Sequence, residues 1–130
     1  MLSETEISRI KLVLSNKTGI DYAILFGSAL KRLLPKSDID LLIGGNVDRS
    51  LKDNLLMELT LEIRRPIDII LSKEARYEVV LRALSSGMLI VAHDREKIKE
   101  DYFRNYRLSE QGYPLKKIRL ERLKRVFNSG

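Results

Sequence analysis

Three aspartates, Asp38, Asp40 and Asp68, are the side chains of this sequence best suited to chemistry. Asp38 and Asp40 enter the apolar segment 39–43, and Asp68 lies inside a second such segment, 66–72. Residues i and i+2 of a strand point to the same face, so a strand at 39–43 would set Asp38 and Asp40 side by side. Two carboxylates that close repel each other unless a cation neutralises both. Mg²⁺ suits the pair, because it prefers oxygen ligands and usually takes one or two carboxylates together with phosphate oxygens.

Asp68 can approach the same ion if its strand lies beside the strand at 39–43. Two or three carboxylates around Mg²⁺ that face an open phosphate site are the arrangement of metal-assisted displacement at phosphorus. Each acid also has an ordinary alternative, since a carboxylate at the entrance of a strand is often only solvated. The order of the elements is more specific: an apolar strand, a Gly-Ser pair, nine residues, Asp-x-Asp entering a strand, a helix and one more strand aspartate.

The Gly27-Ser28 pair could hold the phosphates whose metal the acids would bind. Glycine lets backbone amides approach a ligand closely, and Ser28 adds a hydroxyl donor. The next residues, 29–34, could form a short helix whose N-terminus favours anions. Lys31 or Arg32, one turn along, could neutralise a terminal phosphate, and the sequence does not choose between them. The alternative is that Gly27-Ser28 is a plain turn between a strand and a helix.

The elements that must position these residues follow from the apolar pattern. A first helix should begin after an N-cap at Ser3, with Glu6 at the capping-box spacing, and end before Gly19. Strands are predicted at 22–26, 39–43 and 66–72, and a short apolar run follows at 88–92. Further helices are predicted at 50–64, 73–84, 95–108 and 115–127, with a turn at 109–114. Helices interspersed with three or four short strands indicate an α+β fold in which helices cover one small sheet.

Composition limits the class of protein. The chain has 130 residues, which suits one domain with a single core. It contains no cysteine and one histidine, which excludes disulfides and thiolate metal sites and argues against a histidine-based zinc site. There is no run of 18 apolar residues and no signal-peptide pattern, so we expect a cytoplasmic protein that does not insert into a membrane.

Charge divides the chain into two parts. Residues 1–94 contain 13 Lys or Arg and 13 Asp or Glu, whereas residues 95–130 contain 11 basic and 5 acidic residues. We therefore predict a core domain at 1–94 and a basic helical C-terminal extension at 95–130. Tyrosines interleave with the basic residues of this extension, which suits docking on a partner best, packing on the core next and direct nucleic-acid binding least.

The segment LFGSALKRLLPKSDIDLLI, residues 25–43, resembles the signature of the DNA polymerase β-like nucleotidyltransferase superfamily. Size and layout resemble the minimal nucleotidyltransferases (MNT), the antitoxin half of prokaryotic MNT/HEPN (MntA/HepT) toxin–antitoxin pairs. The resemblance covers about residues 22–92, and the helical tail is compatible with it. It implies a nucleotidyltransferase fold, α+β with a small mixed β-sheet flanked by helices. It also implies Mg²⁺ as the metal and ATP as the nucleotide donor.

The resemblance also implies roles for single residues. Gly27 and Ser28 would bind the triphosphate, and Asp38 and Asp40 would bind the metal. Asp68 would complete the metal site and assist deprotonation of the attacking hydroxyl. In antitoxins of this type the acceptor is a tyrosine of the partner HEPN ribonuclease, and adenylylation silences that toxin. The predicted function is therefore Mg²⁺-dependent transfer of AMP from ATP to a tyrosine of a HEPN-family toxin, by an antitoxin that binds this toxin.

Two alternatives stay open. Many relatives have an arginine followed by a glycine after the Gly-Ser pair, whereas this chain has Lys31-Arg32-Leu33 there. This departure favours an antitoxin that neutralises its toxin by binding alone, while the three intact aspartates favour catalysis. The other alternative is nucleotidyl transfer to a small molecule or RNA, which would need a substrate pocket added beyond residue 84.

Overall fold

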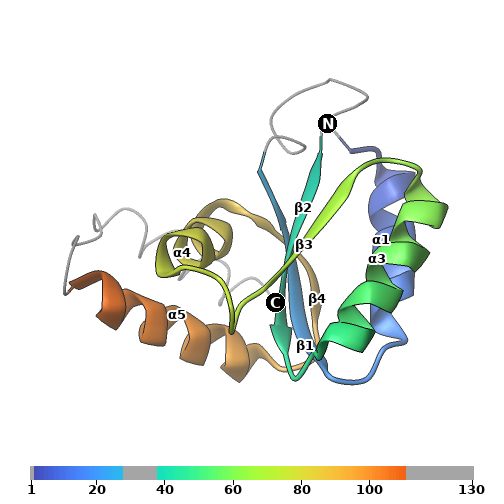
Figure 1. The fold of residues 1–130 in the computed structure, drawn as a ribbon. Helices are drawn as coiled ribbons and strands as arrows, with labels where there is room; N and C mark the ends of the chain where they lie inside the picture. The colour runs from blue at the N-terminus through green and yellow to red at the C-terminus, as the bar shows by residue number, and fades with distance from the viewer. Residues whose placement is uncertain (1, 28–37, 111–130) are drawn as a thin grey trace.

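A computed structural model describes residues 2–27 and 38–110 of the chain. At its centre is a four-stranded sheet with the order β3-β2-β1-β4 (Figure 1). The strands are β1 (Ile20–Phe26), β2 (Ile39–Gly45), β3 (Ile67–Leu71) and β4 (Met88–Ala92). β1 pairs antiparallel with β2 and with β4, whereas β3 runs parallel to β2. The mixed sheet implied by the family resemblance is confirmed.

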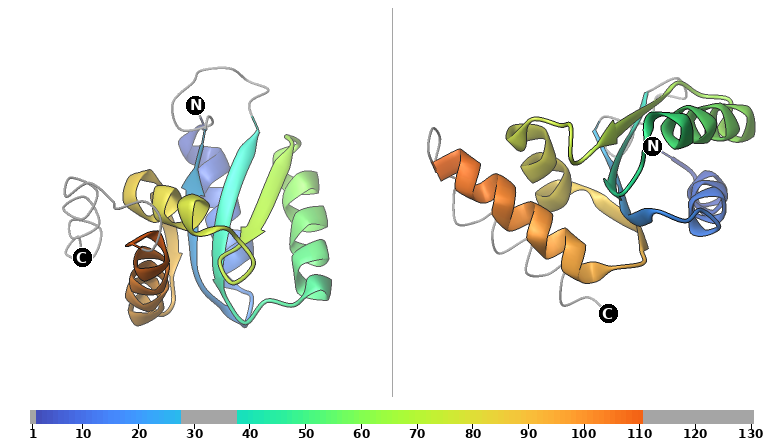
Figure 2. Two further views of the ribbon diagram at one scale, coloured as in Figure 1. Left: turned by 60° about the vertical axis from the view of Figure 1, so that its left-hand side comes forward. Right: turned by 60° about the horizontal axis from the view of Figure 1, so that its bottom comes forward.

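Helices cover both faces of this sheet. They are α1 (Glu4–Ser15), α3 (Arg49–Ile63), α4 (Tyr77–Ser86) and α5 (Arg95–Glu110). α1 and α3 lie on one face, and α4 and α5 lie on the other (Figure 1 and Figure 2). The predicted α+β class is therefore confirmed. Within residues 2–27 and 38–110, no helix is both long enough and apolar enough to cross a membrane.

Each face of the sheet has its own hydrophobic core. Leu41 of β2 packs in the core beneath α1 and α3, together with Leu14 and Leu55. Its neighbour Leu42 packs in the core beneath α4 and α5, together with Tyr102. Successive strand residues point to opposite faces, so a strand buried on both faces needs apolar residues at successive positions. This is why β1 and β2 are nearly continuous apolar runs in the sequence.

The two helices on the first face begin at side-chain caps. The Ser3 hydroxyl accepts a hydrogen bond from the Glu6 N–H, and the Glu6 carboxylate accepts one from the Ser3 N–H, so the predicted capping box is confirmed. Asp48 caps α3 by accepting a hydrogen bond from the Leu51 N–H at 2.8 Å. Both caps provide acceptors for backbone donors that a first helical turn leaves without a partner.

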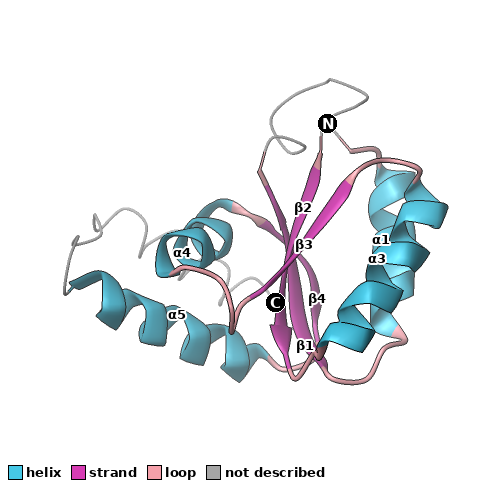
Figure 3. Cartoon of the chain, viewed as in Figure 1, coloured by secondary structure: helices cyan, strands magenta, loops and turns pink. Residues whose placement is uncertain are grey.

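The helix predicted at 73–84 begins four residues later, at Tyr77. After β3 the chain first makes a turn, in which Glu74 and Ala75 donate their backbone N–H groups to the Leu71 carbonyl at 3.0 Å (Figure 3). Lys73 and Glu74 are good helix formers, so propensity did not distinguish this turn from a first helical turn. The prediction was wrong because the chain must change direction between β3 and α4.

The helix predicted at 95–108 is confirmed, but it continues to Glu110. The prediction of a turn at 109–114 was therefore wrong for residues 109 and 110, which belong to the helix. Ser109 is buried inside the helix, and its hydroxyl donates to the Tyr106 carbonyl at 2.6 Å. This local hydrogen bond explains how a serine typical of turns is accommodated in a helix. Two other predicted helices lie outside the described residues, at 29–34 and 115–127.

Candidate functional site

The two strands that carry the acids lie next to each other. β2 and β3 are parallel neighbours, and Asp40 lies directly opposite Asp68 in their register. Paired residues of adjacent strands, which are about 4.8 Å apart, project their side chains to the same face. That face lies beneath α4 and α5, because Leu42 and Ile70, two residues farther along each strand, pack in the core there. The two carboxylates therefore lie side by side at the end of the sheet where β2 and β3 begin.

Asp40 is the acid most affected by its surroundings. The pKa of the Asp40 carboxyl group is raised above its ordinary value. Partial burial is the largest cause, and the negative charges of Asp68 and Asp38 add to it. Asp38 and Asp68 themselves are exposed. A cation beside Asp40 would lower this pKa again, because it would favour the charged form of the carboxylate.

The donor atoms at this end of the sheet fit a hard divalent cation. Carboxylate oxygens are the ligands that Mg²⁺ prefers, and the repulsion acting on Asp40 is what a cation would relieve. In the part of the chain that the structure describes, no three His, Cys, Asp or Glu side chains are gathered closely enough to hold a metal ion. Mg²⁺ commonly takes only one or two protein carboxylates and completes its coordination with water and phosphate oxygens.

Gly27 follows β1 directly and lies close to Asp40. Its φ is +86°, a left-handed conformation that residues with a side chain rarely adopt. A Cβ at this position would overlap the carboxylate of Asp40, whose register partner on β1 is Phe26. Glycine therefore allows the chain leaving β1 to pass directly over the Asp40 side chain. The other predicted phosphate-binding residues lie outside the described part of the chain: Ser28, Lys31 and Arg32.

Two contacts fix the beginning of β3 near the acids. The Ile39 N–H donates to the Pro66 carbonyl at 2.9 Å, which extends the pairing of β2 with β3. Arg65 Nη1 donates to Glu6 Oε2 at 3.3 Å, and only 10% of the Arg65 side chain is exposed. Burial raises the pKa of Glu6, but hydrogen bonds from Ser3 and Arg65 outweigh it and hold that pKa below its ordinary value. The N-terminus of α1 is thus tied to the start of β3.

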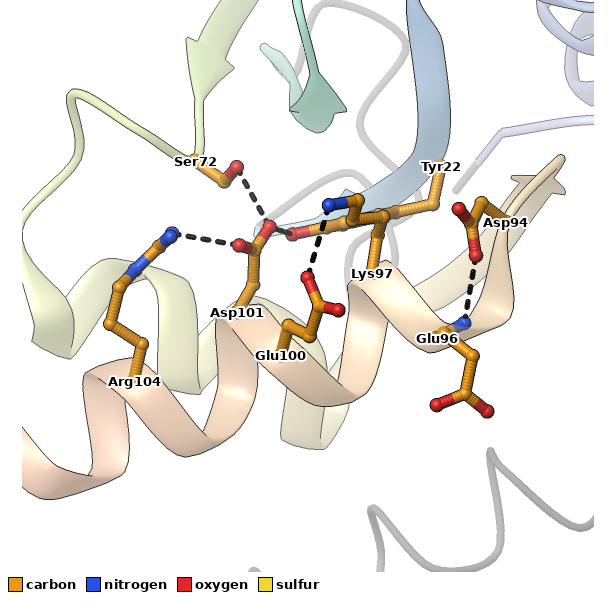
Figure 4. A network of polar contacts seen from close by, with 8 residues as sticks. All are labelled: Tyr22, Ser72, Asp94, Glu96, Lys97, Glu100, Asp101 and Arg104. Carbon is orange, nitrogen blue, oxygen red and sulfur yellow. Dashed lines mark hydrogen bonds and ion pairs between the residues drawn. The ribbon is translucent and has the colours of Figure 1, made fainter.

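A buried polar network lies at the opposite end of the sheet (Figure 4). Asp101 of α5 accepts hydrogen bonds from the Tyr22 hydroxyl at 2.6 Å and from the Ser72 hydroxyl at 3.0 Å. Arg104 donates to the other Asp101 carboxylate oxygen at 2.7 Å. The pKa of Tyr22 is raised far above its ordinary value, mainly by burial and next by the hydrogen bond to Asp101. The sequence did not predict this network, because its partners come from β1, the end of β3 and α5, and no local spacing connects them.

A sequence model of the family described as Polymerase beta, Nucleotidyltransferase matches residues 8–96, more than half of the chain. This chain belongs to that nucleotidyltransferase family. The matched region contains Gly27 and all three aspartates. The superfamily resemblance of residues 25–43 is thereby confirmed. No curated protein sequence matches the chain significantly.

Solved structures share the fold of this nucleotidyltransferase over nearly its whole length. A chain in the crystal structure of the toxin–antitoxin MntA-HepT has a TM-score of 0.67 and 13% identity, with 95% of this chain and 96% of that chain covered. A structure of the tri-AMPylated Shewanella oneidensis HEPN toxin in complex with MNT antitoxin gives a TM-score of 0.68 and 14% identity, with 96% of both chains covered. A toxin–antitoxin structure with AMP-PNP has a TM-score of 0.67 and 18% identity, with 96% of both chains covered. The fold is therefore one found in MNT/HEPN complexes.

Proposed function

We propose that this nucleotidyltransferase is an MNT-type antitoxin that transfers AMP from ATP to a tyrosine of a HEPN-family ribonuclease toxin. The observation that carries the proposal is the register of β2 and β3, which sets Asp40 beside Asp68 within the region matched by the family. The shared fold supports it. Structures with this fold include a tri-AMPylated HEPN toxin in complex with MNT antitoxin and a toxin–antitoxin complex with AMP-PNP.

The three acids would hold the metal and take the proton. In this proposal Asp38 and Asp40 bind Mg²⁺, and Asp68 is either a third ligand or the base. When bound, Mg²⁺ neutralises charge on the phosphates and polarises the transferred group. Burial and like charges oppose ionisation of Asp40, and a cation at this position restores its charged form.

The turn after β1 would hold the triphosphate. Gly27, which already passes over the Asp40 carboxylate, offers a close backbone approach to the phosphates. Ser28 adds its hydroxyl, and Lys31 or Arg32 neutralises the terminal phosphate in this proposal. The nucleotide would thus lie between the end of β1 and the acids at the start of β2 and β3.

The transfer itself needs one proton acceptor. The tyrosine oxygen of the toxin attacks the α-phosphorus of ATP, the bond from that phosphorus to the pyrophosphate oxygen breaks, and pyrophosphate leaves. If Asp68 is the base and not a third ligand, its carboxylate would accept the hydroxyl proton, and its exposure beside Asp40 supports this role. The toxin presents the tyrosine, and the basic extension at 95–130 is the proposed contact with it.

Intact-mass spectrometry of the partner HEPN toxin tests this function. After incubation with ATP and Mg²⁺, the toxin should gain one or more AMP masses with the wild-type protein and none with the double variant Asp38→Ala/Asp40→Ala. Asp53→Ala, at an exposed position on α3, makes the same chemical change away from the acids and should leave the transfer intact. A mass gain that persists in the double variant would contradict the roles of both acids.

The activity of the toxin separates the proposal from its alternatives. Absence of any mass gain, with the toxin still silenced by wild type and double variant, would support neutralisation by binding alone. The altered residues after Ser28 are the feature that favours this alternative. AMP transfer to RNA or to a small molecule that survives deletion of residues 95–130 would instead support a substrate other than the toxin.

A further inference from the structure

The outer edge of β4 is open within the described part of the chain. β4 has a single neighbouring strand there, β1, so its other side ends the sheet. The His93 N–H donates to the Asp21 carbonyl at 2.8 Å, and Tyr22 is the register partner of Ala92. In an antiparallel ladder this makes Tyr22 and Ala92 a non-hydrogen-bonded pair. The backbone N–H and C=O of Ala92 therefore point away from β1, toward the outer side.

A groove of about 480 Å³ runs along this edge. Four consecutive strand residues, 89–92, form one wall, and Lys11 and Ser15 of α1 form another. Ile90 and Val91 are buried in the core beneath α1 and α3, so the strand contributes an apolar base. Within residues 2–27 and 38–110, the groove therefore combines an unpaired strand edge with apolar strand residues, which is what an added β-strand contacts.

The charge of this groove has one sign. Its lining contains the exposed Lys11 and no Asp or Glu of the described residues, whereas Arg95, which also lines it, already has an interaction of its own. His93, also in the lining, bonds through Nδ1 to the Ile20 carbonyl at 2.8 Å, which fixes the orientation of its ring. A segment that carries carboxylates would therefore find complementary charge at Lys11, beside the edge strand.

We propose that an extended, acidic segment of a partner protein binds along β4 as a fifth strand of the sheet. A second copy of this chain fits poorly, because its own β4 groove presents Lys11 and no Asp or Glu of the described residues for pairing with it. The C-terminal part of the chain also has the wrong charge, since residues 111–130 contain six Lys or Arg and one Glu. The binding is separate from the transfer chemistry, because β1 lies between β4 and the acid-bearing β2.

Amide exchange with a synthetic peptide tests the added strand directly. The probe is Glu-Val-Glu-Val-Glu-Val with blocked ends, mixed at millimolar concentration with ¹⁵N-labelled full-length protein. The proposal expects hydrogen exchange at the Ala92 amide to slow, because this N–H becomes bonded to the peptide. The same peptide with Lys in place of every Glu should bind several-fold more weakly. Unchanged exchange at Ala92, or equal binding of the two peptides, would overturn the proposal.

Charge reversal on the protein gives an independent measurement. Lys11→Glu should weaken binding of the labelled acidic peptide, followed by fluorescence anisotropy, by at least about threefold, the scale of one exposed ion pair. Lys73→Glu makes the same change of net charge at another exposed position, outside the groove lining, and should leave binding within twofold of wild type. Equal loss in both variants would overturn the assignment to this groove. Dimerisation abolished by Lys11→Glu would overturn it in favour of a second copy.

Discussion

Gly27 lies so close to Asp40 that a methyl group on its α-carbon would overlap the Asp40 carboxylate. The contact joins the residue that follows β1 to the acid near the start of β2, and it requires a left-handed backbone at Gly27. Any side chain at this position would have to displace either the end of β1 or the carboxylate. The geometry of the turn and the position of the acid are therefore set together.

Replacing Gly27 by alanine should damage the site as well as the fold. Gly27→Ala places a Cβ at φ +86° and against Asp40, whereas Gly19→Ala places one at φ +89° against the Asn46 carbonyl, away from the acids. Each left-handed alanine should lower the free energy of unfolding by about 1–2 kcal/mol, measured by urea titration. AMP transfer, assayed where both variants are folded, should be lost only in Gly27→Ala. Full transfer by this variant would contradict the proposed site.

Asp40 should make the protein less stable as the pH rises from acid to neutral. Its pKa is raised in the folded state above the ordinary value of 3.8, so the folded state holds this proton more tightly than the unfolded chain. The contribution of Asp40 to stability therefore falls as the pH rises above about 3.8. Asp40→Asn should remove this dependence and raise stability at pH 7 by less than about 1 kcal/mol, since water screens a partly exposed carboxylate.

Urea unfolding at pH 4, 5, 6 and 7 measures this effect. Asp53→Asn, the same change at an exposed position of α3, serves as the control and should retain the pH dependence of the wild type. A lower stability of Asp40→Asn than of wild type at pH 7 would show that the Asp40 carboxylate is stabilised, not opposed, by its neighbours.

Mg²⁺ should stabilise the folded protein at neutral pH through the same carboxylate. At a Mg²⁺ concentration ten times its Kd, a ligand of the folded state adds about 1.4 kcal/mol, which thermal unfolding detects as a higher Tm. This rise of Tm should disappear in Asp40→Asn and persist in Asp53→Asn. EDTA should reverse it, and it should become smaller near pH 4, where protons compete with Mg²⁺ for the carboxylate. An equal rise of Tm in wild type and Asp40→Asn would place the metal elsewhere.

Tyr22→Phe should destabilise the fold without touching the acids. The variant leaves the buried Asp101 carboxylate without one of its donors, which costs about 1–3 kcal/mol in unfolding free energy. Tyr106→Phe removes a hydroxyl from a partly exposed ring of the same core and should cost much less. Because the pKa of Tyr22 is raised on folding, wild-type stability should also fall above about pH 10, and this part of the fall should be missing in Tyr22→Phe.

Most of the elements that carry the candidate site could be predicted from the local pattern of apolar residues in the sequence. The strands at 22–26, 39–43 and 66–72 were predictable because each is an apolar run, and no end of these strands differs from its prediction by more than two residues. The approach of Asp68 to Asp40 was predictable once the two strands were taken as neighbours, because register then sets both on one face. The roles of these acids, and of Ser28, Lys31 and Arg32, stay predictions.

The features that the sequence did not predict depend mostly on contacts between distant parts of the chain. Tyr22 and Asp101 are 79 residues apart, and nothing near Asp101 distinguishes it from the solvated acids of the same helix. Glu6 and Arg65 likewise meet only after α1 and β3 have been brought together. The start of α4 was missed for a different reason, since a turn made of good helix formers gives no compositional signal.

The position of β1 in the sheet has a consequence for synthesis on the ribosome. β1 is made before the other three strands of this sheet but lies in its interior, between β2 and a strand that begins only at Met88. Until β4 emerges, one side of this highly apolar strand has no neighbour, which is the kind of edge that attracts other chains. We expect nascent chains arrested before residue 88 to recruit ribosome-associated chaperones in crosslinking experiments, and chains arrested after β4 has left the exit tunnel to release them.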